Sequence, residues 1–359
     1  MSGPNRYLPV LACALCAFLL PALLAATKTA YLLTQLTMSA YYVLASLGLC
    51  LLMGYAGQIS LGQAGFFAIG GYASAFLSKA NLSAFASGRI AGLLEHVGLL
   101  VRGADAYGNA ILSISPWIAF ICAVLLAAGI AALIGTPVLR LKGHYLAMAT
   151  LGFGIIVERI VRGTKDLGSA DGLSGVPSFP ILPGLAVAGG KALRASNFTI
   201  AWLVLALGLL ALVNLIGSRA GRALRALHDG EEAAGAMGVD TSRYKLNAFV
   251  IGAVYAAIAG ALLTHYNGSI GPGEASFMKS VRYVAIVAVG GMANLSGTLV
   301  AGLFLNFLSL RGVFGRFDDA VFGTILVLVM LLAPSGKARG RAGSRPGLPV
   351  FRRRGDPGG

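Results

Sequence analysis

The pattern of hydrophobic and polar positions is dominated by long runs without charge. The longest lies between Lys28 and Lys79, where 50 consecutive residues carry neither a charge nor a histidine. As a single helix this run would be about 75 Å long at 1.5 Å per residue, whereas the hydrocarbon core of a membrane is about 30 Å thick. The chain must therefore turn back within the run. The sequence GYAGQISLG in its middle predicts a break between helices over Tyr31–Met53 and Ala64–Ser78.

Further apolar runs predict the other spans, and only 11% of the residues are charged, against roughly a quarter in globular domains. Leu8–Thr27 is interpreted as a retained first span, with a cleavable signal peptide as the alternative. Tyr283–Leu310 can hold one tilted span or two short ones broken at GGMANLSG. The expected fold is an all-α polytopic membrane protein. The remaining spans are predicted at Pro116–Leu139, Tyr145–Val161, Thr199–Gly217, Leu246–Tyr266 and Phe317–Ala333.

Basic residues predict the orientation in the membrane. Ser218–Lys245 carries five arginines and lysines and residues 337–359 carry seven, so the positive-inside rule places both in the cytoplasm. This requires two spans within Tyr283–Leu310 and gives about ten spans, with both termini cytoplasmic. Residues 1–336 would form the transmembrane domain, including the cytoplasmic segment 218–245. Residues 337–359 would form a basic disordered tail facing anionic lipid, so the net charge of +15 is not taken as a sign of nucleic-acid binding.

Two stretches of the chain resemble each other, GYAGQISLGQAGF (Gly54–Phe66) and HYNGSIGPGEASF (His265–Phe277). Each follows a predicted span, and the two spans run in opposite directions, as in the inverted repeats of transport proteins. Coincidence among abundant glycines and alanines is the alternative. The residues that recur at a constant offset of 211 are Tyr55/Tyr266, Gly57/Gly268, Ile59/Ile270, Gly62/Gly273, Ala64/Ala275 and Phe66/Phe277.

The predicted spans hold almost none of the ionisable residues that ion-driven transporters use. Glu158 and Arg159 lie near a helix end, where an interfacial ion pair is expected. Cys13 and Cys16 are interpreted as small core residues despite their C-x-x-C spacing. The chain has no G-x-x-x-x-G-K-[ST] motif and no catalytic or metal-ligand cluster. We therefore expect no catalytic residue, metal or cofactor, and either a passive channel or a protein that an external ATPase drives.

The cytoplasmic segment carries the sequence EAAGAMG (Glu232–Gly238) after arginines at positions 219, 222 and 225. Leu224, Leu227 and Ala234 predict a helix with an apolar face, which Gly235 and Gly238 loosen or end. Such a helix can dock a soluble partner. An ordinary solvated interfacial helix is the alternative.

Five motifs, given in chain order at the end of this paragraph, resemble those of the permeases of branched-chain amino acid ABC transporters, and together they cover about Tyr31 to Gly336. EAAGAMG is similar to the E-A-A-x-x-x-G loop that docks into the ATPase, without the I-x-L-P that often follows. Family members usually carry T-G-G before D-G-L, where this chain has GSADGLSG, so the outer loop with Asp171 and Gly172 leaves the substrate open. The motifs are GYAGQISLGQAGFFAIGGYASA, HYLAMATLGFGIIVERIV, DGLSGVP, RALRALHDGEEAAGAMGVD and VAVGGMANLSGTLVAG.

The resemblance implies a permease subunit of a bacterial inner membrane, for branched-chain or other hydrophobic amino acids, that binds no ATP itself. Its partners would be a second, homologous permease, two cytoplasmic ATPases, a periplasmic or lipid-anchored solute-binding protein and membrane lipid. Urea, short amides or another small solute, and a passive channel, are the alternatives. The implied docking residues are Arg222, Arg225, Glu232, Ala233, Ala234 and Gly238.

The glycine-rich break would then border the translocation pathway. Small residues such as Gly54, Gly57 and Gly62 allow membrane helices to approach closely. Gln58, Ser60 and Gln63 would satisfy backbone groups freed at the break, or face water in the pathway. The alternative is that these three residues only cap helix ends.

Overall fold

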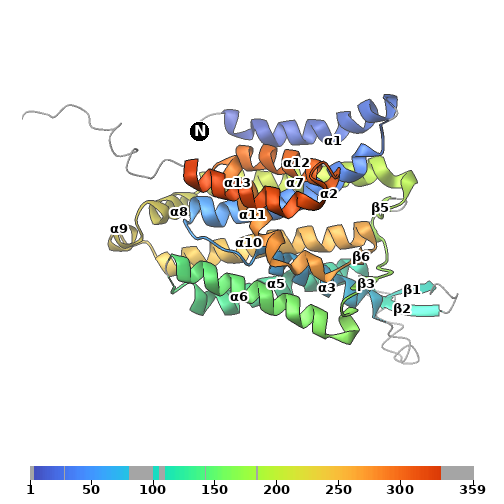
Figure 1. Cartoon of the computed structure of the whole chain (residues 1–359), viewed down its shortest axis with the longest axis horizontal. Coiled ribbons are helices and arrows are strands. Elements are labelled where there is room, and N and C mark those ends of the chain that lie inside the picture. Colours follow the sequence, from blue (N-terminus) through green and yellow to red (C-terminus); the bar gives the residue numbers. More distant parts are fainter. Residues whose placement is uncertain are drawn as a thin grey trace, which may run out of the picture.

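The computed structural model describes residues 4–27, 29–80, 100–104, 110–141, 143–182 and 185–332, which form a bundle of long helices (Figure 1). The long helices and their π-helical turn η2 are α1 (Leu8–Ala26), α2 (Leu32–Cys50), η2 (Leu51–Tyr55), α3 (Gln63–Lys79), α5 (Pro116–Val138), α6 (His144–Gly163), α7 (Arg194–Gly217), α10 (Thr241–Asn267), α11 (Phe277–Gly290), α12 (Leu295–Leu310) and α13 (Asp318–Leu332). Two short helices, α8 (Arg219–Asp229) and α9 (Glu231–Ala236), connect α7 to α10.

Short elements lie in the connections. Three antiparallel two-stranded sheets pair β1 (Leu100–Ala104) with β2 (Ala110–Ile114), β3 (Leu173–Ser174) with β6 (Ser269–Ile270), and β4 (Phe179–Leu182) with β5 (Leu185–Val187). The 3-10 turns are η1 (Pro4–Tyr7), η4 (Lys165–Leu167), η5 (Lys191–Leu193), η6 (Pro272–Ala275) and η7 (Gly315–Phe317).

The all-α membrane fold is confirmed, with the small sheets as its only β structure in the described ranges. Among the residues that the structure describes, six helices are long and apolar enough to cross a membrane, namely α1, α2 with η2, α5, α6, α7 and α10. The other four coincide with the remaining predicted segments but are only 14 to 17 residues long. The chain breaks at GGMANLSG, between Gly290 and Leu295, as the two-helix alternative requires. The total of ten spans stays a prediction, and residues 337–359 lie outside the described residues.

One boundary was predicted wrongly. Helix α11 begins at Phe277, six residues before the predicted start at Tyr283. The side chain of Ser276 accepts a hydrogen bond from the backbone N–H of Lys279 and so caps the earlier start. The six additional residues carry Lys279 and Arg282 into the bundle, where the sequence had suggested an almost uncharged interior.

The two similar stretches lie at opposite ends of the bundle. Gly48 approaches Gly252, and the ring of Tyr41 lies 6.4 Å from that of Tyr266, so α2 and α10 are antiparallel. The stretch after α2 consequently lies at the end that carries α8 and α9, and the stretch after α10 lies at the other end (Figure 1). Both contain a left-handed glycine at the matching position, Gly57 with φ +68° and Gly268 with φ +66°. An inverted repeat predicts this arrangement.

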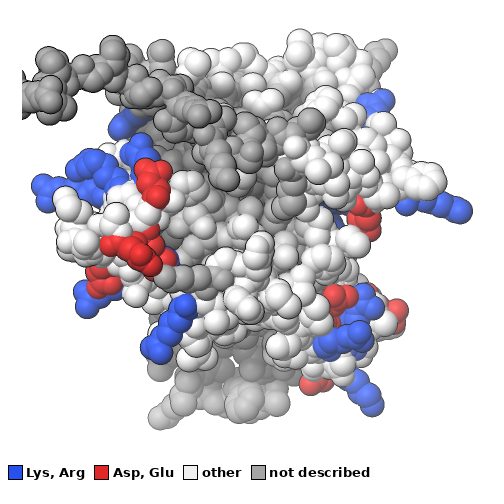
Figure 2. Space-filling model, turned by 60° about the vertical axis from the view of Figure 1, so that its left-hand side comes forward, with Lys and Arg blue, Asp and Glu red and all other residues white. Residues whose placement is uncertain are grey.

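The centre of the bundle is formed by α2, α3 and α10. Gly70 and Gly260 permit the closest crossing, because a Cβ at Gly70 would collide with the backbone of Ala257 and one at Gly260 with the carbonyl of Phe67. The peripheral helix α1 instead exposes leucines, as expected of a helix covered by lipid. On the face shown in Figure 2, charged side chains gather at the two ends and the band between them is mostly uncharged.

Candidate functional site

The segment with the predicted docking motif folds as α8 and α9, which we call the docking helices (Figure 1). The predicted apolar face is present, since Leu224, Leu227 and Ala234 are buried. Two helices form where one was predicted, because the chain turns at Gly230. Gly238, with φ +84°, follows the end of α9 as expected.

The outer surface of α9 is open to solvent. Glu232 and Ala233, two of the predicted docking residues, are exposed, whereas Ala234 is buried and anchors the helix. Met237, which the sequence reasoning missed, is 86% exposed. Methionine adapts to irregular partner surfaces, so an exposed methionine beside small residues is suited to seating α9 in a cleft of another protein.

The inner side of the docking helices is tied to the long helices. Glu231 forms an ion pair with Lys245 of α10, with 2.5 Å between Oε1 and Nζ. Arg225, an exposed residue, donates from Nη2 to the carbonyl of Ile216 at the end of α7 over 2.8 Å. Arg222 is also exposed. These contacts join α8 to the end of α7 and α9 to α10.

The docking helices also contact the glycine-rich break. A Cβ at Gly57 would lie 2.9 Å from Nδ1 of His228 in α8. Gly54 is equally constrained, since its Cβ would collide with Ala293 in the turn before α12. The spacing of these residues in the sequence gave no indication of either contact. The break is thus clamped between the docking helices and the turn between α11 and α12.

Helix α3 begins well inside the bundle. Its first residue, Gln63, donates from Nε2 to the carbonyls of Ala45 (2.9 Å) and Gly252 (3.0 Å). Ala45 lies ten residues before the end of η2, which corresponds to about 15 Å along the helix. The backbone N–H of Ala64 donates to Oγ of Ser280 in α11. The segment between η2 and α3 therefore carries non-helical backbone to the interior, which membranes tolerate only where protein or a water-filled cavity surrounds it.

The polar residues of the break are all buried. Gln58, Ser60 and Gln63 are 5%, 2% and 2% exposed. Oγ of Ser60 accepts from the N–H of Gly62, which itself packs against Thr150 of α6. Oε1 of Gln58 has no hydrogen-bond partner among the described residues. Gly62 therefore contacts α6, Gln63 contacts α2 and α10, and Ala64 contacts α11. The carbonyls that Gln63 binds lie within helices and not at the break, and the role of these residues in a pathway stays a prediction.

The outer-loop residues lie at the opposite end. Asp171 is exposed, and Gly172, with φ +75°, approaches Ile270 so closely that a Cβ would collide with its carbonyl. The following strand, β3, pairs with β6. Nζ of Lys79 donates to the carbonyl of Ser174 over 2.9 Å. The D-G-L loop therefore rests on the second similar stretch and on the end of α3, away from the docking helices.

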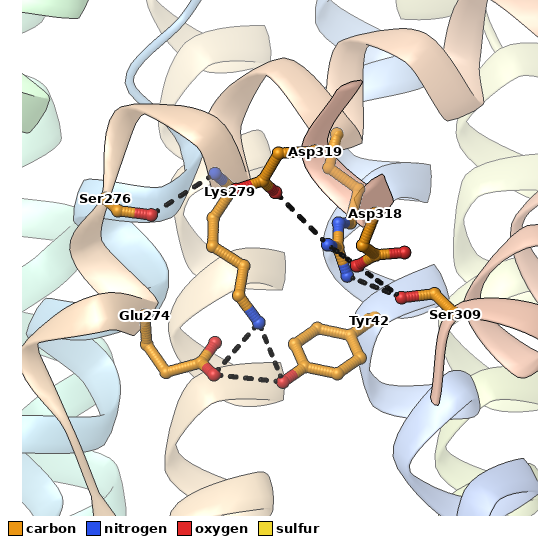
Figure 3. Close-up of polar contacts among 8 residues, drawn as sticks. Tyr42, Glu274, Ser276, Lys279, Ser309, Asp318 and Asp319 are labelled. Carbon is orange, nitrogen blue, oxygen red and sulfur yellow. Dashed lines mark hydrogen bonds and ion pairs between the residues drawn. The ribbon is translucent and has the colours of Figure 1, made fainter. Parts of the chain in front are cut away.

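A cluster of charged residues, which we call the polar cluster, was missed by the sequence reasoning (Figure 3). In its first half, Nζ of Lys279 lies 3.0 Å from Oε1 of Glu274 and 3.2 Å from the hydroxyl of Tyr42. That hydroxyl donates to Oε1 of Glu274 over 3.0 Å. Tyr42 lies ten residues, about 15 Å, along α2 from its start, so this half is recessed from the end of the bundle.

In the second half of the polar cluster, Arg282 forms an ion pair with Asp318 at the start of α13 and donates to Ser309 of α12 over 3.0 Å. Asp319 lies 3.5 Å from the same guanidinium. Oε2 of Glu274, Nε of Arg282 and Oδ1 of Asp318 have no hydrogen-bond partner among the described residues. The cluster ties α11 to α2, α12 and α13. The N-cap at Ser276 was the sequence signal that could have placed these charges on a helix.

Two smaller expectations also meet the structure. Glu158 forms its ion pair with Arg162, over 2.8 Å, and not with Arg159, because residues four apart face each other on a helix. Cys13 and Cys16 are free thiols, buried and partly buried on α1. No group of three or more His, Cys, Asp or Glu residues in the described ranges could hold a metal ion.

Comparison with known proteins gives a consistent result. The family model for the branched-chain amino acid transport system permease component matches residues 31–333. The high-affinity branched-chain amino acid transport permease LivM of Escherichia coli K12 is 32% identical over 321 residues, which covers 84% of this chain and 68% of LivM. LivH of the same organism is 28% identical over 309 residues, covering 84% of this chain and 92% of LivH.

A shorter match joins residues of this chain to BraD of Pseudomonas aeruginosa, a permease with the same description, at 34% identity over 33% of this chain and 39% of BraD. No solved structure matches the chain. The family model covers most of the helical bundle, from the start of α2 to the end of α13. The chain is therefore a multi-pass membrane protein of the branched-chain amino acid transport permease family.

Proposed function

We propose that this chain is the permease subunit of an ABC importer and forms half of the translocation pathway for branched-chain or other hydrophobic amino acids. Separate ATPase subunits would drive it, and the chain would bind no ATP. One observation carries the proposal beyond family membership. The docking helices present Glu232, Ala233 and Met237 to solvent while their inner side contacts Lys245 and Gly57.

The mechanism follows from these contacts. Closure of the ATPases would push α9, and the ion pair between Glu231 and Lys245 would transmit that push to α10. The contact between His228 and Gly57 would transmit it to the break before α3. Since α3 packs along α10 through Gly70 and Gly260, the two helices would move together and open the interior alternately to each face.

The remaining partners are proposed on related grounds. Escherichia coli K12 has two permeases of the same description, LivM and LivH, and this chain is similar to both, which supports pairing with a second, homologous permease. A periplasmic or lipid-anchored binding protein would deliver the solute. The start of α1 and the end of α13 lie at the end with the docking helices (Figure 1), which would place both in the cytoplasm of an inner-membrane protein.

Uptake into proteoliposomes that contain the permease pair, the ATPases and the binding protein tests the proposal. Leucine should accumulate only with ATP, and Ser60→Trp should abolish uptake while the complex still assembles. Gly129→Trp is the matched control, because a side chain at Gly129 meets nothing within 4 Å. Leucine flux without ATP would favour a passive channel, and accumulation of urea or acetamide in place of leucine would overturn the substrate assignment.

A further inference from the structure

A cavity of about 290 Å³ opens where several helix ends meet, on the side of the bundle that carries the docking helices. Arg6 precedes α1, Tyr55 ends η2 and Arg225 lies on α8. The end of α7 and the turn before α12 close the remaining walls. The full lining is Arg6, Pro9, Tyr55, Val213, Ile216, Gly217, Arg225, Ala293, Asn294, Leu295 and Ser296.

Both arginines are held in place by contacts that leave their charge unneutralised. The guanidinium of Arg6 lies 4.5 Å from the centre of the Tyr7 ring and donates to the Tyr7 hydroxyl. Arg225 donates to the backbone carbonyls of Ile216 and Gly221. Neither forms an ion pair with a carboxylate in the part of the chain that the structure describes.

The first turn of α12 adds to the positive potential. Leu295 and Ser296 line the cavity with the N-terminus of a 16-residue helix, whose free N–H groups carry a partial positive charge. The side chain of Asn294 accepts a hydrogen bond from the N–H of Gly297, so it does not bind the N–H groups of Leu295 and Ser296. The cavity thus combines two full positive charges with a helix terminus and suits a tetrahedral anion such as a phosphodiester.

The cavity lies beside the N-terminal end of the apolar helix α1, and the ends of helices that cross a membrane are where phospholipid headgroups meet a protein. Arg6 is two residues from the apolar helix α1, and Leu8, Leu11 and Leu15 of that helix are each about 60% exposed. An exposed apolar helix face next to a basic cavity matches the two parts of a phospholipid, its acyl chains and its anionic headgroup.

We propose that this cavity binds the headgroup phosphate of an anionic phospholipid, whose acyl chains lie along the exposed face of α1. The site depends only on the membrane fold and not on the proposed transport function. The bound lipid would bridge α1 to the docking helix α8 through Arg6 and Arg225, beside Tyr55 at the end of η2.

Titration of the purified full-length chain in detergent with dioctanoyl phosphatidylglycerol, followed by thermal unfolding, tests the site. Dioctanoyl phosphatidylcholine and inorganic phosphate serve as comparisons. The wild-type chain should be stabilised by phosphatidylglycerol more than by either, and 0.5 M NaCl should weaken the effect because exposed charges are then screened. The double variant Arg6→Gln/Arg225→Gln should bind phosphatidylglycerol about 30-fold more weakly. Arg219→Gln, on the same helix but outside the cavity, should bind as the wild type does.

Each of three results would overturn the proposal. Equal stabilisation of the wild-type chain by phosphatidylglycerol and phosphatidylcholine would show that the site does not select an anionic headgroup. Saturation by inorganic phosphate alone would make the cavity a site for free phosphate. Unchanged binding in the double variant would place the lipid elsewhere. The first two comparisons need no variant, so they decide the matter even if the double variant fails to fold.

Discussion

The crossing of α3 and α10 yields the most quantitative prediction, for the substitution Gly70→Ala. A Cβ at this position would collide with both the carbonyl oxygen and the Cα of Ala257. Both atoms belong to backbone, so no change of rotamer can relieve the overlap. The two helices must separate, and the packing between them must loosen along the crossing. We therefore expect Gly70→Ala to destabilise the folded bundle.

Replacing glycine by alanine within a helix also gains about 1 kcal/mol of helix propensity. The loss of stability in Gly70→Ala is therefore measured relative to a control variant with the same gain. Gly152→Ala in α6 provides it, because a Cβ there meets nothing within 4 Å. The propensity term cancels in the difference between the two variants. What remains is the cost of overpacking a dense core, about 1–3 kcal/mol, or roughly 5- to 150-fold in the unfolding equilibrium.

Titration of the detergent-solubilised protein with SDS, followed by the fluorescence of its two tryptophans, measures this difference. Gly70→Ala should unfold at a lower SDS fraction than Gly152→Ala. Gly260→Ala should behave like Gly70→Ala, and the double variant should lose less than the sum, because the first substitution already separates the helices. Coincident transitions for Gly70→Ala and Gly152→Ala would refute the close crossing.

Two further predictions concern the ends of the bundle. Gly57→Ala and Gly268→Ala introduce similar backbone strain, about 1–2 kcal/mol at a left-handed position. Of the two glycines, Gly57 touches a docking helix and Gly268 does not. Leucine uptake should therefore fall further for Gly57→Ala, and equal losses would contradict the coupling through α8. Lys279→Ala leaves the Glu274 carboxylate without its cation, which should lower the stability measured in the SDS titration by about 1–3 kcal/mol. The double variant Lys279→Met/Glu274→Gln should recover most of that stability. A Lys279→Ala variant as stable as the wild type would show that the polar cluster does not stabilise the fold.

Much of the fold could be predicted because membrane helices are long apolar runs. The break before α3 followed from length alone, and its helix begins at Gln63, one residue before the expected Ala64. The start of α11 was misplaced because Lys279 and Arg282 read as a polar connection. Their charges are tolerated inside the bundle only because Glu274 and Asp318 lie opposite, and that pairing depends on tertiary structure.

The candidate site was predictable as residues but not as contacts. The glycine at position 57 and the EAAGAMG motif are visible in the sequence, yet nothing in their spacing shows that His228 lies against Gly57. The same holds for Tyr42 and Lys279, which are 237 positions apart and meet within 3.2 Å. Contacts between distant segments arise from the packing of whole helices, and local sequence patterns do not predict that packing.

Co-purification measures whether an ATPase docks on α9, as we propose. The full-length permease pair and its tagged ATPase would be solubilised together, and the ATPase bound per permease measured. Glu232→Arg and Met237→Asp should each abolish association, because both residues lie on the exposed surface of α9. Asp166→Arg, an exposed charge reversal between α6 and β3, should leave it unchanged. If both α9 variants bind the ATPase as the wild type does, α9 is not the docking helix.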